Sequence, residues 1–244
     1  MAIFRTKSDF DWVENGGILT KHTQSFGGNG RGEEEWDSAD RATKDSWMNR
    51  YNYEAQLISD ICQEHNLTKI IELGSGPGGL AEKINSIHST KLDYTLVDKP
   101  NAKLQWKELN YKATNFEVID LNNNFSTETL DEDYDLIIAN DFLEHIANVT
   151  DCLIQSYNIS KDNAKMFVSV PNWRMGHSFQ YQGLFDHDNW VHTMYAHGWK
   201  VETIYRSNIP CPPLPKLSSE ETLPDNFINS WNRYYLANKI KIDG

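Results

Sequence analysis

The sequence predicts an α/β fold in three layers, a doubly wound parallel sheet with helices on both faces. Two observations carry this prediction. Short apolar segments alternate along the chain with segments of helical periodicity, which is the pattern of strands and helices in such a sheet. Two of these segments, IIEL at 70–73 and LIIAN at 136–140, are almost continuously apolar, as expected for strands covered on both faces.

The elements follow from local patterns. A first helix is predicted over 45–65, where apolar residues recur at helical spacing and Asn66 can end it. Strands are predicted at 69–73, 92–97, 116–120, 134–140, 166–170, 200–205 and 234–240. Further helices are predicted at 80–88, 102–110, 149–159 and 189–197. The proline-rich segment 210–225 has no apolar period and is predicted to be a loop.

Composition and charge limit the class of protein. The chain has 244 residues, 39% of them hydrophobic and 24% charged, as in an ordinary globular domain. No apolar run reaches the ~18 residues of a membrane span. Residues 1–17 lack the apolar stretch of a signal peptide, and the three cysteines are far apart, so we expect free thiols and a cytoplasmic location. The formal net charge of −12 disfavours binding to nucleic acid or to an anionic membrane.

A glycine-rich turn follows the first predicted strand, in the stretch IIELGSGPGG. Gly74, Ser75, Gly76 and Gly78 fit both the dinucleotide pattern G-x-G-x-x-G and the pattern [D/E]-x-G-x-G-x-G. Glycines permit a tight turn and close approach of a ligand to the backbone. Glu72 favours the second pattern. An acid at the end of a buried strand is costly without partners, and a ligand with an ammonium and a sulfonium group would provide them.

Acidic residues also follow the second and third predicted strands. Asp98, next to Lys99, stands where a carboxylate can accept both hydroxyls of a ribose, which both cofactor patterns require. Asp120 could accept the exocyclic amine of an adenine while Leu121 covers the ring. Ligands of parallel sheets bind beyond the carboxyl ends of the strands, so these residues are candidates for one common site.

The fourth predicted strand ends in IIANDFLEHI, with Asn140 and Asp141 at its end and Glu144 and His145 beyond it. Together with IELGSGPG, LVDKP and VIDLN, in this order and spacing, this stretch resembles class I S-adenosylmethionine-dependent methyltransferases. LEH is typical of the broad group that includes ubiquinone-biosynthesis O-methyltransferases. FVSVPNW resembles the fifth strand of that group, and RYYLANKIKI its antiparallel seventh. The resemblance implies a seven-stranded sheet, mostly parallel with an antiparallel last strand.

The resemblance favours S-adenosylmethionine over a dinucleotide. A dehydrogenase would need a further parallel strand and usually a second domain, for which the chain after Val170 is too short. The implied cofactor-binding residues are Glu72, Gly74, Ser75, Gly76, Gly78, Asp98, Lys99, Asp120, Leu121, Asn140 and Asp141. We expect a methyltransferase domain over 45–244 with a substrate-facing insertion around 171–233. Residues 1–44 form an extension that could act as a lid. The segment from about Trp36 to Tyr51 could close over the cofactor, with Arg50 or Tyr51 meeting its carboxylate.

The expected reaction is methyl transfer to an oxygen or nitrogen atom of a small-molecule acceptor. Such a displacement depends mainly on placing the acceptor in line with the sulfur. His145 is the candidate general base, with Glu144 beside it as an orienting carboxylate. An aromatic cluster after the fifth strand, which includes Trp173 and Phe185, suits a planar acceptor. No motif defines the acceptor or the oligomeric state.

Two alternatives stay open. Asp141, Glu144 and His145 could share one face of a helical turn and bind a divalent ion, as a similar E-x-x-E-H does in small-RNA 2′-O-methyltransferases, with His187 as a further ligand. Asp141 stands where those enzymes have Glu, and the acidic charge disfavours RNA, so no metal site is assigned. The other alternative is a non-catalytic module that binds the cofactor.

Overall fold

The structure is a computed structural model that describes residues 41–76, 78–98, 114–119, 121, 130–146, 149–171, 187–207, 217–218 and 232–242. Residues 1–40 of the N-terminal extension, the helix predicted at 102–110 and most of the 171–233 insertion lie outside these residues.

The helices and strands alternate as predicted. The chain begins with α4 (Arg41–His65), β1 (Lys69–Leu73), α5 (Gly79–Ile87), β2 (Asp93–Asp98), β3 (Thr114–Val118) and β4 (Tyr134–Asn140). It continues with the 3₁₀ turn η2 (Leu143–His145), α7 (Val149–Asn158), β5 (Ser160–Pro171), α8 (His187–Ala196), β6 (Trp199–Ser207), β7 (Leu217–Ser218) and β8 (Asn232–Lys239). None of the described helices is long and apolar enough to cross a membrane.

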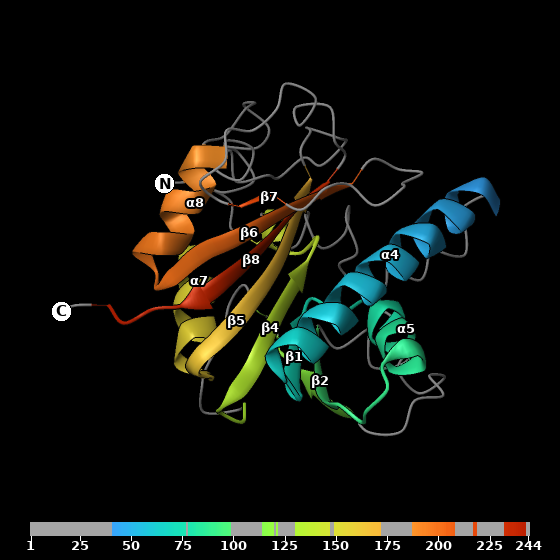
Figure 1. The fold of residues 1–244 in the computed structure, drawn as a ribbon, viewed down its shortest axis with the longest axis horizontal. Helices are drawn as coiled ribbons and strands as arrows, with labels where there is room; N and C mark the ends of the chain where they lie inside the picture. The colour runs from blue at the N-terminus through green and yellow to red at the C-terminus, as the bar shows by residue number, and fades with distance from the viewer. Residues whose placement is uncertain are drawn as a thin grey trace, which may run out of the picture.

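The strands form one sheet in the order β3-β2-β1-β4-β5-β8-β6-β7. Neighbouring strands from β3 to β5 are parallel, and β8 is antiparallel to both β5 and β6 (Figure 1). The predicted seven-stranded sheet with an antiparallel last strand is therefore confirmed. The two-residue strand β7, which pairs with β6, was not predicted, because it is too short to show a period and lies in the segment predicted to be a loop.

The predicted start of β5 was wrong in an informative way. β5 begins at Ser160, six positions before the predicted start at 166, and its first residue pairs with Tyr134. A register shift in β4 separates that pair from the remaining β4–β5 pairs, and Asn163 has a φ of 65°. The first residues of β5 are polar and irregular, so a prediction based on runs of apolar residues does not detect them.

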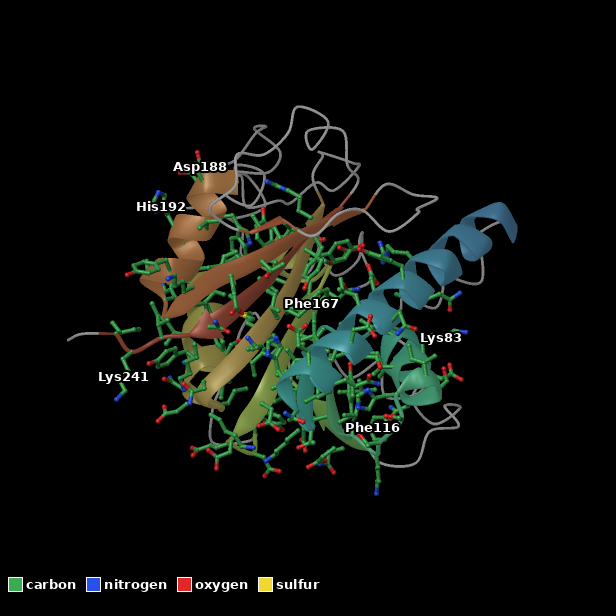
Figure 2. All side chains as sticks on the ribbon, viewed as in Figure 1. Lys83, Phe116, Phe167, Asp188, His192 and Lys241 are labelled. Carbon is green, nitrogen blue, oxygen red and sulfur yellow. The ribbon has the colours of Figure 1, made fainter. Side chains whose placement is uncertain are left out.

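Helices cover both faces of the sheet. Ala55 and Ile58 of α4 and Leu80 and Ile84 of α5 are buried in one core cluster, together with Phe167 of β5. The side chain of Phe167 lies inside the molecule, whereas Lys83 and Lys241 lie at its periphery (Figure 2). The other face is packed by a second cluster to which α7 contributes Cys152 and Leu153, and α8 contributes Trp190 and Met194. These are the three layers that the sequence predicts.

The strand order creates one special edge. Chain order runs outward from β1 through β2 to β3 on one side, and from β4 to β5 on the other. The carboxyl ends of the adjacent β1 and β4 therefore diverge into connections on opposite faces of the sheet. Such a switch point opens a crevice for a ligand. The predicted site residues follow these strand ends.

At the opposite edge of the sheet, where the parallel strands begin, Asp135 of β4 binds the neighbouring strands through hydrogen bonds. Its Oδ2 accepts hydrogen bonds from the backbone N–H groups of Thr68 and Lys69, at 3.0 and 2.9 Å, and from the Thr68 hydroxyl. Its Oδ1 accepts one from Lys161 Nζ at 2.6 Å. Burial raises the pKa of Asp135, but the bonds from Lys161, Lys69 and Thr68 together lower it below the ordinary value. This carboxylate joins the starts of β1, β4 and β5.

We expect Asp135→Asn to lower the free energy of unfolding by about 1–2 kcal/mol at neutral pH, because charge-assisted hydrogen bonds become neutral ones. The pKa of Asp135 is lowered by folding, so its contribution is complete above the unfolded pKa of ~3.9 and is lost as pH falls through the folded pKa. Urea unfolding at several pH values should show the two proteins converging under acid conditions. Asp131→Asn is the control, since this carboxyl is 70% exposed and lies 3.7 Å from Lys69; an equal loss in both variants would contradict the assignment.

Candidate active site

The glycine turn is fixed to the end of β2 by its own backbone. The N–H groups of Gly74 and Ser75 both donate to the carbonyl oxygen of Val97, at 2.9 and 3.1 Å. The N–H of Gly76 donates to Asp98 Oδ2 at 2.6 Å. The turn and the candidate ribose acceptor are thus joined directly, and Asp98 is held at the carboxyl edge of the sheet.

Two glycines of the turn are required for different reasons. Gly74 has a φ of +69°, and a Cβ there would lie 2.0 Å from Cδ2 of Phe142, so the ring packs where a side chain would be. Gly76 has a φ of +52°, but a Cβ there would meet nothing within 4 Å among the described atoms. The backbone at Gly76 therefore borders open space, as a cradle for a ligand must.

Buried polar atoms near the turn point to a missing partner. Ser75 Oγ and Asn140 Oδ1 are both buried and have no hydrogen-bond partner within the described part of the chain. Buried polar groups are normally satisfied, so each such atom needs a reason. Both belong to residues at strand ends that flank the switch point, Ser75 after β1 and Asn140 at the end of β4. A polar ligand bound there would supply both partners.

Glu72 is buried in the sheet just before the turn, with 3% of its surface exposed. Its Oε2 accepts a hydrogen bond from the Tyr94 hydroxyl at 2.8 Å. The pKa of Glu72 is raised to about 8, mainly by burial and also by the nearby carboxyls of Glu54 and Asp98, while the hydrogen bond from Tyr94 opposes the shift. A cation beside Glu72 would favour its ionised form.

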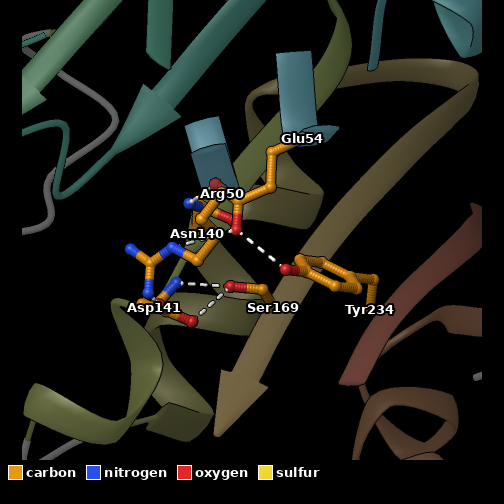
Figure 3. A network of polar contacts seen from close by, with 6 residues as sticks. All are labelled: Arg50, Glu54, Asn140, Asp141, Ser169 and Tyr234. Carbon is orange, nitrogen blue, oxygen red and sulfur yellow. Dashed lines mark hydrogen bonds and ion pairs between the residues drawn. The ribbon is translucent and has the colours of Figure 1, made fainter. Parts of the chain in front are cut away.

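A second group of polar side chains connects α4 to the ends of β4, β5 and β8 (Figure 3). Arg50 Nη1 of α4 lies 2.5 Å from Asp141 Oδ2, and Arg50 Nε lies 3.3 Å from Glu54 Oε1. The Ser169 hydroxyl donates to Asp141 Oδ1 at 2.6 Å and accepts from the Asp141 N–H at 2.7 Å. Asp141 has a φ of 46°, and these bonds hold it in that left-handed conformation.

Glu54 lies at the centre of this group and is completely buried. Its Oε2 accepts from Asn140 Nδ2 at 3.0 Å and its Oε1 from the Tyr234 hydroxyl at 2.9 Å. Burial raises the pKa of Glu54 to about 7, and Asp141 adds to the rise, against the lowering effect of Arg50, Tyr234 and Asn140. Burial lowers the pKa of Arg50, but Asp141 and Glu54 raise it more, so the guanidinium stays charged.

Glu144 and His145 lie in η2, directly after this group. Burial and the neighbouring Asp141 raise the pKa of Glu144 well above its ordinary value. This shift disfavours the ionised form, which is the form that binds a metal ion. Both oxygens of Asp141 are already bound by Arg50 and Ser169. Across the described residues, no three His, Cys, Asp or Glu side chains are grouped as a metal site would require.

The structure brings most of the predicted cofactor residues to one edge of the sheet. Eight of them lie at, or directly after, the carboxyl ends of β1, β2 and β4. They are Glu72, Gly74, Ser75, Gly76, Gly78, Asp98, Asn140 and Asp141. Leu121 is buried in the core cluster of one sheet face. Lys99, Asp120 and the side chains of His145 and His187 lie outside what the structure describes, so their roles stay predictions.

The sequence analysis missed Glu54, Ser169 and Tyr234. Glu54 carried a usable signal, because it falls on the apolar stripe of α4 with Ile58 and Ile61, where an acid must have partners. Tyr234 gave no such signal, since it lies 180 positions from Glu54 in an ordinary strand.

Comparison with known proteins defines the class. A family described as "Methyltransferase domain" matches residues 40–203, so the chain belongs to this methyltransferase family. No curated protein matches the chain.

Solved structures share the fold at low identity. The magnesium protoporphyrin IX methyltransferase ChlM of Synechocystis PCC 6803, with bound S-adenosylmethionine, has a TM-score of 0.60 and 14% identity over 91% of this chain and 97% of that one. An S-adenosylmethionine-dependent methyltransferase of Clostridium acetobutylicum has a TM-score of 0.57 and 12% identity over 78% and 92% of the two chains. The CurJ carbon methyltransferase, TM-score 0.53 and 16% identity, matches 71% of this chain, which spans only 49% of that protein. The class I methyltransferase fold predicted from the motifs is confirmed.

We expect Gly74→Ala and Gly76→Ala to lower the free energy of unfolding by different amounts, because Gly74 is packed against Phe142 and Gly76 borders open space. Gly74→Ala should lower the free energy of unfolding by about 2–4 kcal/mol, because it adds a clash with Phe142 to an unfavourable φ. Gly76→Ala should cost only about 1 kcal/mol, the strain of its φ alone. Chemical denaturation measures both, and equal losses would show that the space beside Gly76 is filled.

Proposed function

We propose that this protein transfers the methyl group of S-adenosylmethionine to an oxygen or nitrogen atom of a small-molecule acceptor. The observation that carries the proposal is the glycine turn at the switch point, where the backbone at Gly76 borders open space and its N–H is bound to Asp98. The buried, unsatisfied oxygens of Ser75 and Asn140 support a polar ligand at this place.

The residues present fit the charge of this cofactor, and the backbone at Gly76 leaves space for it. In the proposed binding mode Asp98 accepts the ribose hydroxyls, and the open backbone at Gly76 lies against the nucleoside. Glu72, Asn140 and Asp141 surround the amino-acid end. The pKa of Glu72, raised by burial to about 8, is consistent with a place reserved for a cation. From the sequence alone, Asp120 and Leu121 are assigned to the adenine, and Lys99 to the cofactor without a defined contact.

The chain's part in the reaction is placement. When bound, S-adenosylmethionine supplies a methyl group attached to a cationic leaving group. The rigid strand ends hold the donor, and the acceptor must be oriented opposite the sulfur, which can contribute several kcal/mol. We assign acceptor binding to the insertion around 171–233 of a methyltransferase domain over 45–244. We assign a covering role to the N-terminal extension, residues 1–44. The cytoplasmic location stays a prediction.

The metal-assisted RNA methyltransferase is the weaker alternative. In that reading Asp141 would be a metal ligand, and both of its contacts, with Arg50 and with Ser169, would have to break. No contact in the described residues favours it.

Calorimetry tests the proposal directly. We expect the parent protein to bind S-adenosylmethionine, and Asp98→Ala to weaken binding by about 10- to 100-fold, because a carboxylate that bonds the ribose and the turn is lost. Asp131→Ala, an exposed carboxyl elsewhere on the protein, is the control and should leave affinity unchanged. No detectable binding by the parent protein would refute the proposal.

The catalytic assignment needs a turnover assay. We expect His145→Ala to lower kcat by about 10²-fold or more if the acceptor carries a proton that a general base must remove, with little change in cofactor affinity. Glu144→Gln should have a smaller effect, because burial and Asp141 raise the pKa of the parent carboxyl and disfavour its ionised form. Release of S-adenosylhomocysteine with a panel of hydroxyl and amine acceptors measures both. Unchanged turnover in His145→Ala would remove the base assignment.

A further inference from the structure

Glu54 contacts a candidate cofactor residue from outside the site. It belongs to α4, and its Oε2 accepts a hydrogen bond from Asn140 Nδ2 at 3.0 Å, 86 positions away. Its other oxygen accepts from Tyr234 of β8 at 2.9 Å. Glu54 is fully buried, so it does not reach solvent, and it is bonded on both sides by donors from the sheet (Figure 3).

The carboxylate determines which way the amide of Asn140 faces. An ionised carboxylate can only accept hydrogen bonds, so Asn140 must turn its NH₂ group toward Glu54. The carbonyl oxygen Oδ1 then points to the other side of the amide, where it is buried and has no partner within the described residues. A buried acceptor left unsatisfied is costly, so this orientation is explained best by a donor that arrives with a ligand.

The position of Asn140 indicates which ligand group this is. Asn140 ends β4 two residues after Ile138, which pairs with Glu72 of β1, and the glycine turn begins two residues after Glu72. The oxygen therefore lies at the level of the turn, beside the strand that carries Glu72. In the proposed binding mode this is the amino-acid end of the cofactor, whose ammonium group is its hydrogen-bond donor.

We propose that Glu54 is a positioning residue whose carboxylate fixes the amide of Asn140 with Oδ1 toward the cofactor, where it accepts a hydrogen bond from the α-ammonium group of S-adenosylmethionine. This inference rests on the proposed function and adds to it a residue that never touches the cofactor. It also makes the orientation of the Asn140 amide depend on whether Glu54 is ionised. A protonated Glu54 can donate to Oδ1, which lets the amide rotate and turns NH₂ toward the ammonium.

Several charged or titratable groups face Glu54. They are Arg50 and Tyr51 on α4, Glu72 on β1, Asp141 after β4 and Tyr234 on β8. With all of them in place, burial first and Asp141 next raise the pKa of Glu54 to about 7. Binding of an ammonium through Asn140 requires the ionised form, so affinity should fall as pH drops below about 7.

A pair of ligands isolates the ammonium contact. S-adenosylhomocysteine carries the amino-acid end, whereas 5′-methylthioadenosine keeps the adenosine and the thioether and lacks it. At about pH 8, where Glu54 is mostly ionised, we expect Glu54→Gln to weaken S-adenosylhomocysteine binding about tenfold or more. It should change 5′-methylthioadenosine binding less than about twofold, because the nucleoside contacts are kept. Equal losses for both ligands, or no loss for either, would overturn the inference.

A double-mutant cycle shows whether Glu54 acts through Asn140. If it does, Glu54→Gln should add nothing to the loss already caused by Asn140→Ala. Additive losses would mean that Glu54 acts by another route, for example through Arg50, and would overturn the inference. Glu64→Gln makes the same chemical change at an exposed position of the same helix and should leave both affinities unchanged.

A second variant keeps the test decisive if Glu54→Gln does not fold. Tyr234→Phe removes a hydrogen bond that lowers the pKa of Glu54. We then compare the affinity for S-adenosylhomocysteine with that for 5′-methylthioadenosine across a pH series. The pH at which this ratio falls to half of its value at alkaline pH should move upward by about 0.5–1 unit. An unmoved midpoint would overturn the inference. A parent protein that binds neither ligand nor S-adenosylmethionine would instead refute the proposed function.

Discussion

The crowding of buried carboxyl groups at one edge of the sheet is the constraint on which the site depends. Glu72, Glu54 and Glu144 are each at most 3% exposed, and Asp98 and Asp141 lie beside them. Burying several like charges together is costly, and proteins respond by protonating some and bonding the rest. Here the pKa values of the three glutamates are raised, which favours their protonated forms. In addition, hydroxyl groups from β2, β5 and β8 donate hydrogen bonds to Glu72, Asp141 and Glu54, respectively. A cationic ligand reduces this repulsion, while an anionic one would add to it.

This electrostatic arrangement also explains why α4 belongs to the site. Its apolar stripe only needs to cover the sheet, and Ala55 and Ile58 do so. Arg50 and Glu54 add an ion pair and hydrogen bonds to the ends of β4 and β8, which fix the rotation of the helix about its own axis. Because Arg50 is largely buried, removing either of its partners would leave a charge in a poorly solvated place. The helix that precedes the first strand is therefore bonded to the same edge of the sheet that carries the predicted cofactor residues.

Features that follow from the order of strands along the chain could be predicted from the sequence. Contacts between side chains that are far apart in the chain could not. Glycines after β1 and an acid after β2 could be assigned to one site, because parallel strands place all their carboxyl ends at one edge. The bond between Gly76 and Asp98 agrees with that reasoning. No local pattern could show that Tyr234 of an antiparallel strand and Glu54 of a helix meet over 180 positions. The early start of β5 was lost for a related reason, since paired backbone there carries polar side chains.

The same contacts narrow the choice of a base for methyl transfer. Asp141 directly follows β4, but Arg50 and Ser169 bind both of its oxygens. Accepting a proton there would cost an ion pair, so Asp141 is a poor base. Burial and Asp141 raise the pKa of Glu144 well above its ordinary value, which disfavours the ionised form that a base needs. An acceptor that ionises easily needs neither residue, whereas an alcohol must rely on a group outside this network, and His145 is the residue in the sequence whose ordinary pKa suits that task.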